Sequence, residues 1–154
     1  MLLPFVVVVL FPRWILTSWT TRDVRWGDST AALAGDVIGS LVFLGGFCLF
    51  LWCLALFANV GRGTLAPWDP TRHLVAVGPY RFVRNPMITA VAAMLAGEAF
   101  LFGSALLAGW VILFMLVNHI YFVFAEEPGL ERRFGAGYVE YKKRVPRWLP
   151  RKPR

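Results

Sequence analysis

Long apolar blocks separated by short polar segments dominate the chain. Residues 37–60 contain no charged side chain, and residues 87–125 contain one carboxylate and one histidine. About 20 apolar residues cross a hydrocarbon core of roughly 30 Å, so the first block predicts one membrane span. The second block would be roughly 58 Å long as a single helix at 1.5 Å per residue. It therefore predicts two spans that turn at Gly103-Ser104.

Residues 2–19 are also apolar, apart from an interruption at Pro12-Arg13. A kinked span and a shallow interfacial helix both fit this pattern, and we favour the span. A cleaved signal is not expected, because no basic region and no small-residue cleavage site precede Pro12. The expected fold class is all-α: one polytopic membrane domain over residues 1–154, with about four transmembrane helices near 2–19, 33–58, 87–103 and 105–125.

Two polar segments flank the last apolar block. Residues 61–86 are rich in proline and glycine, which prevents long regular structure, yet their apolar content predicts an ordered cytosolic loop rather than a linker. After Ala125, apolar residues recur every three or four positions and predict a C-terminal amphipathic helix: Leu130, Phe134, Tyr138, Tyr141 and Val145. That helix fits either the membrane surface or a lid folded against residues 61–85.

Composition and charge agree with a membrane protein. The chain is 58% hydrophobic and 16% charged, which leaves too few polar groups to cover a soluble domain. Nine of its 16 basic residues lie from Arg132 onward, and residues 61–85 hold four more. The positive-inside rule then predicts a multi-pass protein with both of these segments, and both termini, in the cytoplasm. The net charge of +7 is expected to meet anionic lipid headgroups rather than nucleic acid.

Arg84-Asn85 lies at the start of one predicted span and Glu126-Glu127 at the end of the next. A helical hairpin places these two ends on the same side of the bilayer. They could form an interfacial salt bridge between snorkelling side chains. Alternatively, they could form a pocket for a zwitterionic ligand, whose two charges need opposite charges at fixed places.

These segments resemble the isoprenylcysteine carboxyl methyltransferases and the related phospholipid N-methyltransferases. The similarity rests on Gly61-Arg62-Gly63-Thr64, His73 to Tyr80 and Arg84-Asn85-Pro86-Met87, together with Glu126-Glu127 and the spaced residues that follow it to Val145-Pro146-Arg147. It covers roughly residues 40–150. Eukaryotic members usually carry Arg-His-Pro where this chain has Arg84-Asn85-Pro86, so the chain is more similar to the small bacterial members, and the bacterial inner membrane is the expected location.

The resemblance implies S-adenosyl-L-methionine as cofactor, bound at the cytosolic face. By position, the cofactor cleft would be lined by Gly63, His73, Leu74, Val75, Gly78, Tyr80, Arg84, Asn85 and Pro86, and closed by Glu126 and Glu127. Arg84, Asn85 and Glu127 are the expected catalytic residues. The acceptor would be a small hydrophobic or lipid-like molecule, either an isoprenoid-type carboxylate or a phospholipid amine.

Two further polar residues lie within the spans. Glu98 is roughly 16 Å along the third predicted span at 1.5 Å per residue, and an ionisable group at that depth is costly and often functional. Glu98 and His119 are candidate substrate contacts, although a protonated carboxyl bonded to a neighbouring helix and a packed neutral histidine are the simpler interpretations. The sequence shows no metal-ligand pattern.

Two other functions remain open at this stage. Membrane sterol reductases have a similar C-terminal arrangement and use NADPH, but they are much longer. A non-catalytic membrane scaffold would bind neither cofactor. The sequence predicts neither the acceptor nor the oligomeric state.

Overall fold

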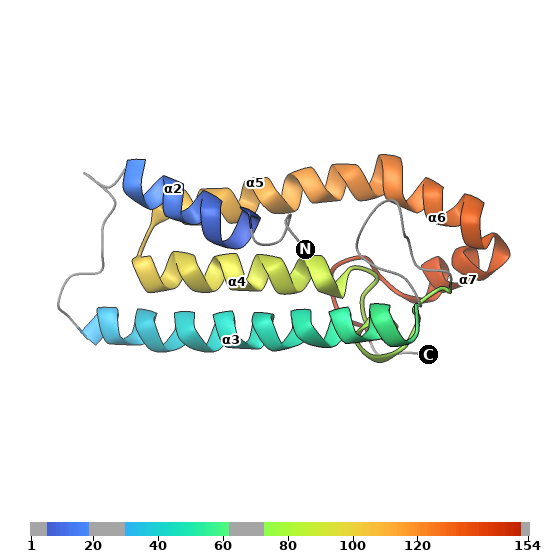
Figure 1. The fold of residues 1–154 in the computed structure, drawn as a ribbon, viewed down its shortest axis with the longest axis horizontal. Coiled ribbons are helices and arrows are strands. Elements are labelled where there is room, and N and C mark those ends of the chain that lie inside the picture. The colour runs from blue at the N-terminus through green and yellow to red at the C-terminus, as the bar shows by residue number, and fades with distance from the viewer. Residues whose placement is uncertain (1–5, 19–29, 62–72, 152–154) are drawn as a thin grey trace. The chain divides into compact units, whose positions relative to one another are not determined.

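The computed structural model describes residues 6–18, 30–61 and 73–151, and these residues form helices and connecting turns without a strand. The helices are drawn in Figure 1. In chain order they are the π-helical turn η1 (Val6–Leu10), α2 (Phe11–Ser18), α3 (Thr30–Asn59), the 3-10 turn η2 (Gly78–Arg81), α4 (Pro86–Phe102), α5 (Ala105–Tyr121), the π-helical turn η3 (Phe122–Glu126), α6 (Glu127–Phe134) and α7 (Ala136–Arg144). The predicted all-α fold is confirmed.

Within the described residues, two helices are long and apolar enough to cross a membrane. They are Leu33–Asn59 and the continuous helix Ala105–Phe134, and only 17% and 11% of their most apolar windows are buried. A core helix of a soluble protein would be mostly covered, so these apolar faces are available to lipid. The other two predicted spans correspond to the shorter apolar helices Val6–Ser18 and Pro86–Phe102. Four spans therefore stay a prediction, and residues 2–5 and 19 of the first lie outside the described residues.

The chain divides into two compact units. One comprises Met1–Cys48 and Ala90–Leu116, and the other comprises Leu49–Thr89 and Val117–Arg154. In the first unit, α3 and α4 lie side by side (Figure 1) at a contact between Gly39 and Gly97. A Cβ atom on Gly97 would lie 2.7 Å from the Phe43 nitrogen and 2.8 Å from the Gly39 oxygen. The missing side chains therefore let the two backbones touch, as is common between membrane helices.

The Gly97 contact supports a first prediction. We expect Gly97→Ala to destabilise the protein by about 1–3 kcal/mol, because the added methyl group meets backbone atoms that cannot move aside. The measurement is thermal unfolding in detergent. Gly109→Ala on α5 is the matched control, since a Cβ there meets nothing within 4 Å. Equal unfolding temperatures for the two variants would contradict the close α3–α4 contact.

The hairpin between α4 and α5 turns where the sequence predicted it, at Gly103, whose φ of +58° favours glycine. Phe11 of α2 stacks on Trp110 of α5 with ring centroids 4.4 Å apart. These contacts complete the first unit.

The sequence predicts that the last span ends near residue 125, but the helix that begins as α5 does not end there. It continues through η3 into α6 and ends at Phe134. Pro128 lies in the first turn of α6. In a regular α-helix its ring would clash with the carbonyl group four residues earlier. The wider π-helical turn directly before α6 interrupts that regular pattern and allows the helix to continue.

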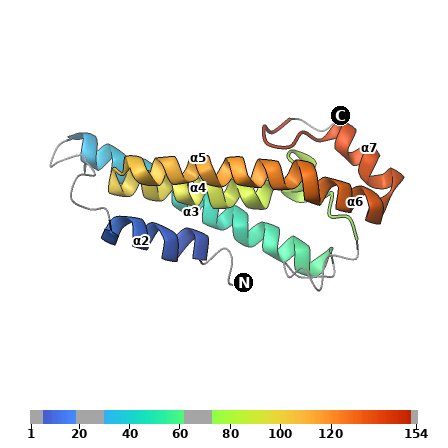
Figure 2. The same cartoon turned by 90° about the horizontal axis from the view of Figure 1, so that it is seen from above.

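The predicted C-terminal amphipathic helix is two helices. Gly135 separates α6 from α7 with φ 55° and ψ −135°, a conformation that side chains disfavour. The chain reverses at this point, so α7 runs back from the end of α6 (Figure 2). The sequence did not show the break, because the spacing of apolar residues continues through Gly135 to Tyr138, which is buried.

The second unit has a small apolar core around the end of α3. Cys53, Val75 and Tyr80 are buried there, with four partly buried residues packed against them: Leu49, Leu56, Phe57 and Met87. This core holds residues 75–80 against the end of α3. It therefore holds the residues that follow Tyr80 in a defined place.

Candidate functional site

Three cations converge on the carboxylate of Glu127, at the start of α6. Its Oε1 atom accepts hydrogen bonds of 2.8 Å from Arg84 Nη1 and of 2.8 Å from Arg147 Nε. Its Oε2 atom lies 3.1 Å from Lys142 Nζ, which also binds Glu131 at 2.7 Å. Glu127 is only 4% exposed. Both oxygen atoms of Glu127 therefore have partners within the protein. Through them the carboxylate links three parts of the chain: Arg84 in the loop before α4, Lys142 in α7 and Arg147 in the C-terminal segment.

Backbone hydrogen bonds hold the C-terminal segment on residues 80–84. The Arg84 N–H donates to the Pro146 carbonyl at 2.9 Å, and the Arg151 N–H donates to the Phe82 carbonyl at 3.2 Å. The Tyr141 hydroxyl donates to the Tyr80 carbonyl at 2.7 Å. Of the two arrangements that the sequence allowed, the segment after α6 adopts the lid that folds back on this loop.

Tyrosines surround the ion-pair cluster, and all remain neutral phenols at physiological pH. Burial raises the pKa of Tyr80 far above its ordinary value, and the neighbouring Cys53, Tyr141 and Glu126 raise it further. Burial is also the main cause of the raised pKa of Tyr141 and of Tyr138. The pKa of Lys142 is raised by its hydrogen bonds to Glu131 and Glu127, so this ammonium stays charged.

Three buried polar atoms beside the cluster lack a hydrogen-bond partner among the described residues: Arg84 Nε, Asn85 Nδ2 and the Tyr80 hydroxyl. The Tyr80 hydroxyl lies beside the Cys53 thiol, but without the geometry of an ordinary hydrogen bond. Buried polar groups are nearly always paired, and leaving one unpaired costs about 1–3 kcal/mol. Three such atoms within six residues of sequence therefore mark positions where a ligand can bind.

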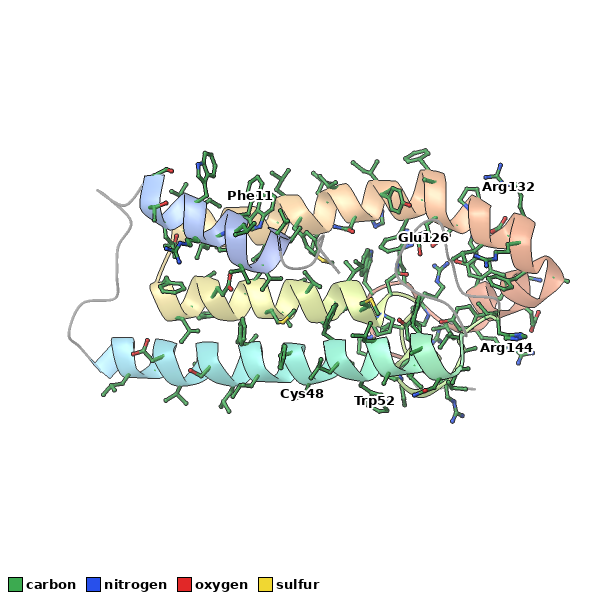
Figure 3. All side chains as sticks on the ribbon, in the orientation of Figure 1. Phe11, Cys48, Trp52, Glu126, Arg132 and Arg144 are labelled. Atoms are coloured by element: carbon green, nitrogen blue, oxygen red, sulfur yellow. The ribbon has the colours of Figure 1, made fainter. Side chains whose placement is uncertain are left out.

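Glu126 differs from its neighbour Glu127. It is half-buried, and its side chain has no hydrogen bond or ion pair with another residue in the described part of the chain. Figure 3 shows Glu126 on the inner side of its helix, whereas Arg132 points outward. Its charge contributes to the raised pKa of Tyr80, after burial, Cys53 and Tyr141. Glu126 is thus a carboxylate that is available to a ligand.

An apolar pocket of about 280 Å³ adjoins these residues in the sequence. Its lining is almost wholly hydrocarbon and aromatic: Leu49, Trp52, Pro79, Phe82, Val83, Pro86, Thr89, Trp148 and Pro150. Four of these residues lie between positions 79 and 86, in the same loop as the polar residues Tyr80, Arg84 and Asn85. Polar and apolar binding surfaces are therefore supplied by the same short loop.

The other predicted cofactor residues lie along the segment before this loop. His73 is exposed, and its backbone N–H donates to the Gly61 carbonyl at 3.3 Å. Leu74 is half-buried, Val75 is in the core, Gly78 forms a turn and Pro86 is buried at the start of α4. Gly63 lies outside the described residues.

The two candidate substrate residues within the spans do not join the ion-pair cluster. His119 Nδ1 accepts a hydrogen bond of 3.0 Å from Trp148 Nε1, which ties α5 to the C-terminal segment. Glu98 belongs to the first unit, and its buried Oε2 atom has no partner among the described residues. No group of three possible metal ligands occurs in the described ranges.

Sequence reasoning missed two partners of Glu127: Arg147, which lies 2.8 Å from it, as Arg84 does, and Lys142, which lies 3.1 Å from it. Arg147 carried a usable signal, because it belongs to the Val145-Pro146-Arg147 motif. Lys142 carried none, since it is one of several basic residues on the polar side of α7.

A family model described as phospholipid methyltransferase matches residues 34–137, which is more than half of the chain. The match includes most of α3, the loop around Arg84, the α4–α5 hairpin and Glu126-Glu127. No curated protein and no solved structure shows significant similarity to the chain.

Proposed function

The chain belongs to the phospholipid methyltransferase family, and from this premise we propose that it methylates a lipid acceptor in a site built from Arg84, Asn85 and the Glu126-Glu127 pair. It is a membrane enzyme, its methyl donor is S-adenosyl-L-methionine, and its acceptor is of the phospholipid type. Family membership selects the methyltransferase over the reductase and the scaffold.

The polar groups of the site fit this methyl donor. S-adenosyl-L-methionine carries a carboxylate, and the unpaired Arg84 Nε and Asn85 Nδ2 are donors of the kind that bind carboxylates. Arg84 and Asn85 would hold that end, while Glu127 keeps the Arg84 guanidinium in place. The remaining predicted cofactor residues would line the cleft: Gly63, His73, Leu74, Val75, Gly78, Tyr80 and Pro86.

When bound, the sulfonium supplies an electrophilic methyl group. The protein then contributes position and exclusion of water, which can account for most of the acceleration of a displacement reaction. The C-terminal segment covers the Arg84 loop through its backbone hydrogen bonds. The apolar pocket beside the loop would take the hydrocarbon part of the acceptor. Glu98 and His119 remain candidate contacts for other parts of the acceptor.

The observation that carries this proposal is the cluster of buried, unpaired polar atoms beside the Arg84–Glu127 ion pair. For the topology we propose four spans, with both termini in the cytoplasm and the site at the cytosolic face of a bacterial inner membrane. The basic residues of the 73–85 and 132–151 segments support this orientation.

The function is tested with purified protein, isotopically methyl-labelled S-adenosyl-L-methionine and a total membrane lipid extract. We expect mass spectrometry to find label on a lipid, and calorimetry to show binding of S-adenosylhomocysteine but not of NADPH. Binding of NADPH, or of neither molecule, would contradict the proposal. The labelled lipid identifies the acceptor.

A further inference from the structure

Trp148 contacts both the apolar pocket and the long helix that begins as α5. Its indole Nε1 donates a hydrogen bond of 3.0 Å to His119 Nδ1. Its ring packs edge-on against Phe122, with ring centroids 5.8 Å apart. The same ring lines the pocket, whereas His119 lies outside the pocket lining. The Trp148 side chain therefore connects His119 to the wall of the pocket.

The bond to His119 sets the direction of the indole ring. Backbone hydrogen bonds at Pro146 and Arg151 hold the segment on either side of Trp148 against the loop before α4. Rotation about the side-chain torsions of Trp148 breaks neither of these bonds, so they do not select its rotamer. The indole has a single N–H donor, and its bond to His119 selects the rotamer that lines the pocket.

The pocket beside Trp148 is suited to hydrocarbon. The Thr89 hydroxyl donates to the Asn85 carbonyl at 3.1 Å and the Trp148 N–H donates to His119, so both groups have partners within the protein. Trp52 lines the pocket from α3, where it is exposed on a helix apolar enough to cross a membrane. A lipid chain can therefore enter sideways from the bilayer. The volume of about 280 Å³ is close to that of the smallest ligand pockets, roughly 300 Å³, so it holds part of one chain.

We propose that Trp148 determines which acyl chains this site accepts, and that His119 is the positioning residue that holds the Trp148 ring in place. This inference rests on the proposed function, and it names an acyl chain of the acceptor lipid as the occupant of the pocket. An unbranched chain fits beside the ring, whereas a chain with methyl branches meets it. Packed side chains yield little, so a wall of this kind discriminates between the two chains.

The test measures chain preference by competition within one vesicle. The full-length protein is reconstituted with equal amounts of two phosphatidylethanolamines, one with unbranched oleoyl chains and one with methyl-branched phytanoyl chains, and receives methyl-labelled S-adenosyl-L-methionine. The ratio of the two labelled products gives the ratio of their kcat/KM values. Loss of folded protein lowers both products equally, so this ratio reports the pocket and not the stability of a variant.

We expect the wild type to favour the unbranched lipid about 10- to 200-fold, the discrimination that one methylene group in an apolar pocket provides. Trp148→Ala should lower this preference at least about tenfold, because it removes the wall. His119→Phe should lower it about 2- to 10-fold, as loss of one hydrogen bond implies. His119→Asn should keep it, since the amide oxygen can accept the indole N–H. Trp14→Ala is the control and should also keep it, because Trp14 is an exposed tryptophan outside the pocket lining.

Three results would overturn the inference. The first is a Trp148→Ala preference equal to that of the wild type. The second is an unchanged preference in His119→Phe, or a loss in His119→Asn as large as in His119→Phe, since either would remove the role of the hydrogen bond. The third is weakened S-adenosylhomocysteine binding by Trp148→Ala at an unchanged preference, which would assign the pocket to the methyl donor instead.

A photoactivatable phosphatidylethanolamine, with a diazirine in one acyl chain, gives a second measurement that needs no turnover. On illumination we expect this chain to attach to the peptides that contain Trp52 and Trp148, which line the pocket from two parts of the chain. Attachment confined to other segments would contradict the acyl-chain site even in an active enzyme. Attachment at these two peptides, with no methylation of any lipid in a total membrane extract, would contradict the proposed function alone.

Discussion

Glu127→Gln is expected to destabilise the second unit by about 3–5 kcal/mol, because it removes the negative charge that neutralises two largely buried guanidinium groups. The side chains of Arg84 and Arg147 are 10% and 19% exposed, so water cannot replace the lost partner. We expect a large fall in unfolding temperature in detergent. Affinity for S-adenosylhomocysteine should also fall, since Arg84 loses the contact that holds it.

Glu140→Gln is the matched control for this variant. It removes the same charge from an ion pair with Arg144 in which both side chains are more than half exposed. Exposed pairs contribute about 0–1 kcal/mol, so little change is expected. If the two variants unfold at the same temperature, the three cations around Glu127 do not stabilise the fold.

Arg84→Lys is expected to weaken S-adenosylhomocysteine binding about 10- to 100-fold, as loss of a charged hydrogen bond of about 1.5–3 kcal/mol implies. Arginine can bind Glu127 through Nη1 while Nε remains free for a ligand. Lysine has a single nitrogen and lacks this planar fork. The variant therefore keeps the ion pair and most of the stability while it loses the ligand contact. Calorimetry and thermal unfolding together measure both effects.

Arg81→Lys is the control, because Arg81 lies three residues earlier on the same loop but is exposed. Its affinity for S-adenosylhomocysteine should match the wild type. An Arg84→Lys protein that binds the ligand normally would show that Arg84 serves the fold alone.

The hydrophobic pattern was enough to predict the helices, because the placement of a helix in lipid depends on its apolar composition more than on particular side-chain contacts. The α3 helix and the turn at Gly103 are found where the sequence placed them. The hairpin argument also predicted that Arg84 and Glu127 would lie on one side, and the structure places them 2.8 Å apart. Two long apolar runs joined by a short turn can form few arrangements other than a helical hairpin.

The finer features of the site depend on contacts that no local pattern reports. The two adjacent glutamates are chemically identical in the sequence, and only the folded chain shows that Glu127 takes all three cations. The break at Gly135 was hidden because the apolar spacing continues through it. Likewise, the lack of a hydrogen-bond partner for the Tyr80 hydroxyl depends on the residues packed around it, which the sequence motif does not show.

The π-helical turn η3 has a genetic consequence. Hydrogen bonds in such a turn reach one residue further than in an α-helix, and each α-helical residue rotates the chain by about 100°. Loss of a single codon between Phe122 and Ala125 would keep the reading frame and every charged residue. It would remove the extra residue of the π-helical turn, so the helix would become regular and Glu127 would keep its register. The Pro128 ring would then clash with the carbonyl group four residues earlier, so the damage would come from a strained or kinked helix at the start of α6.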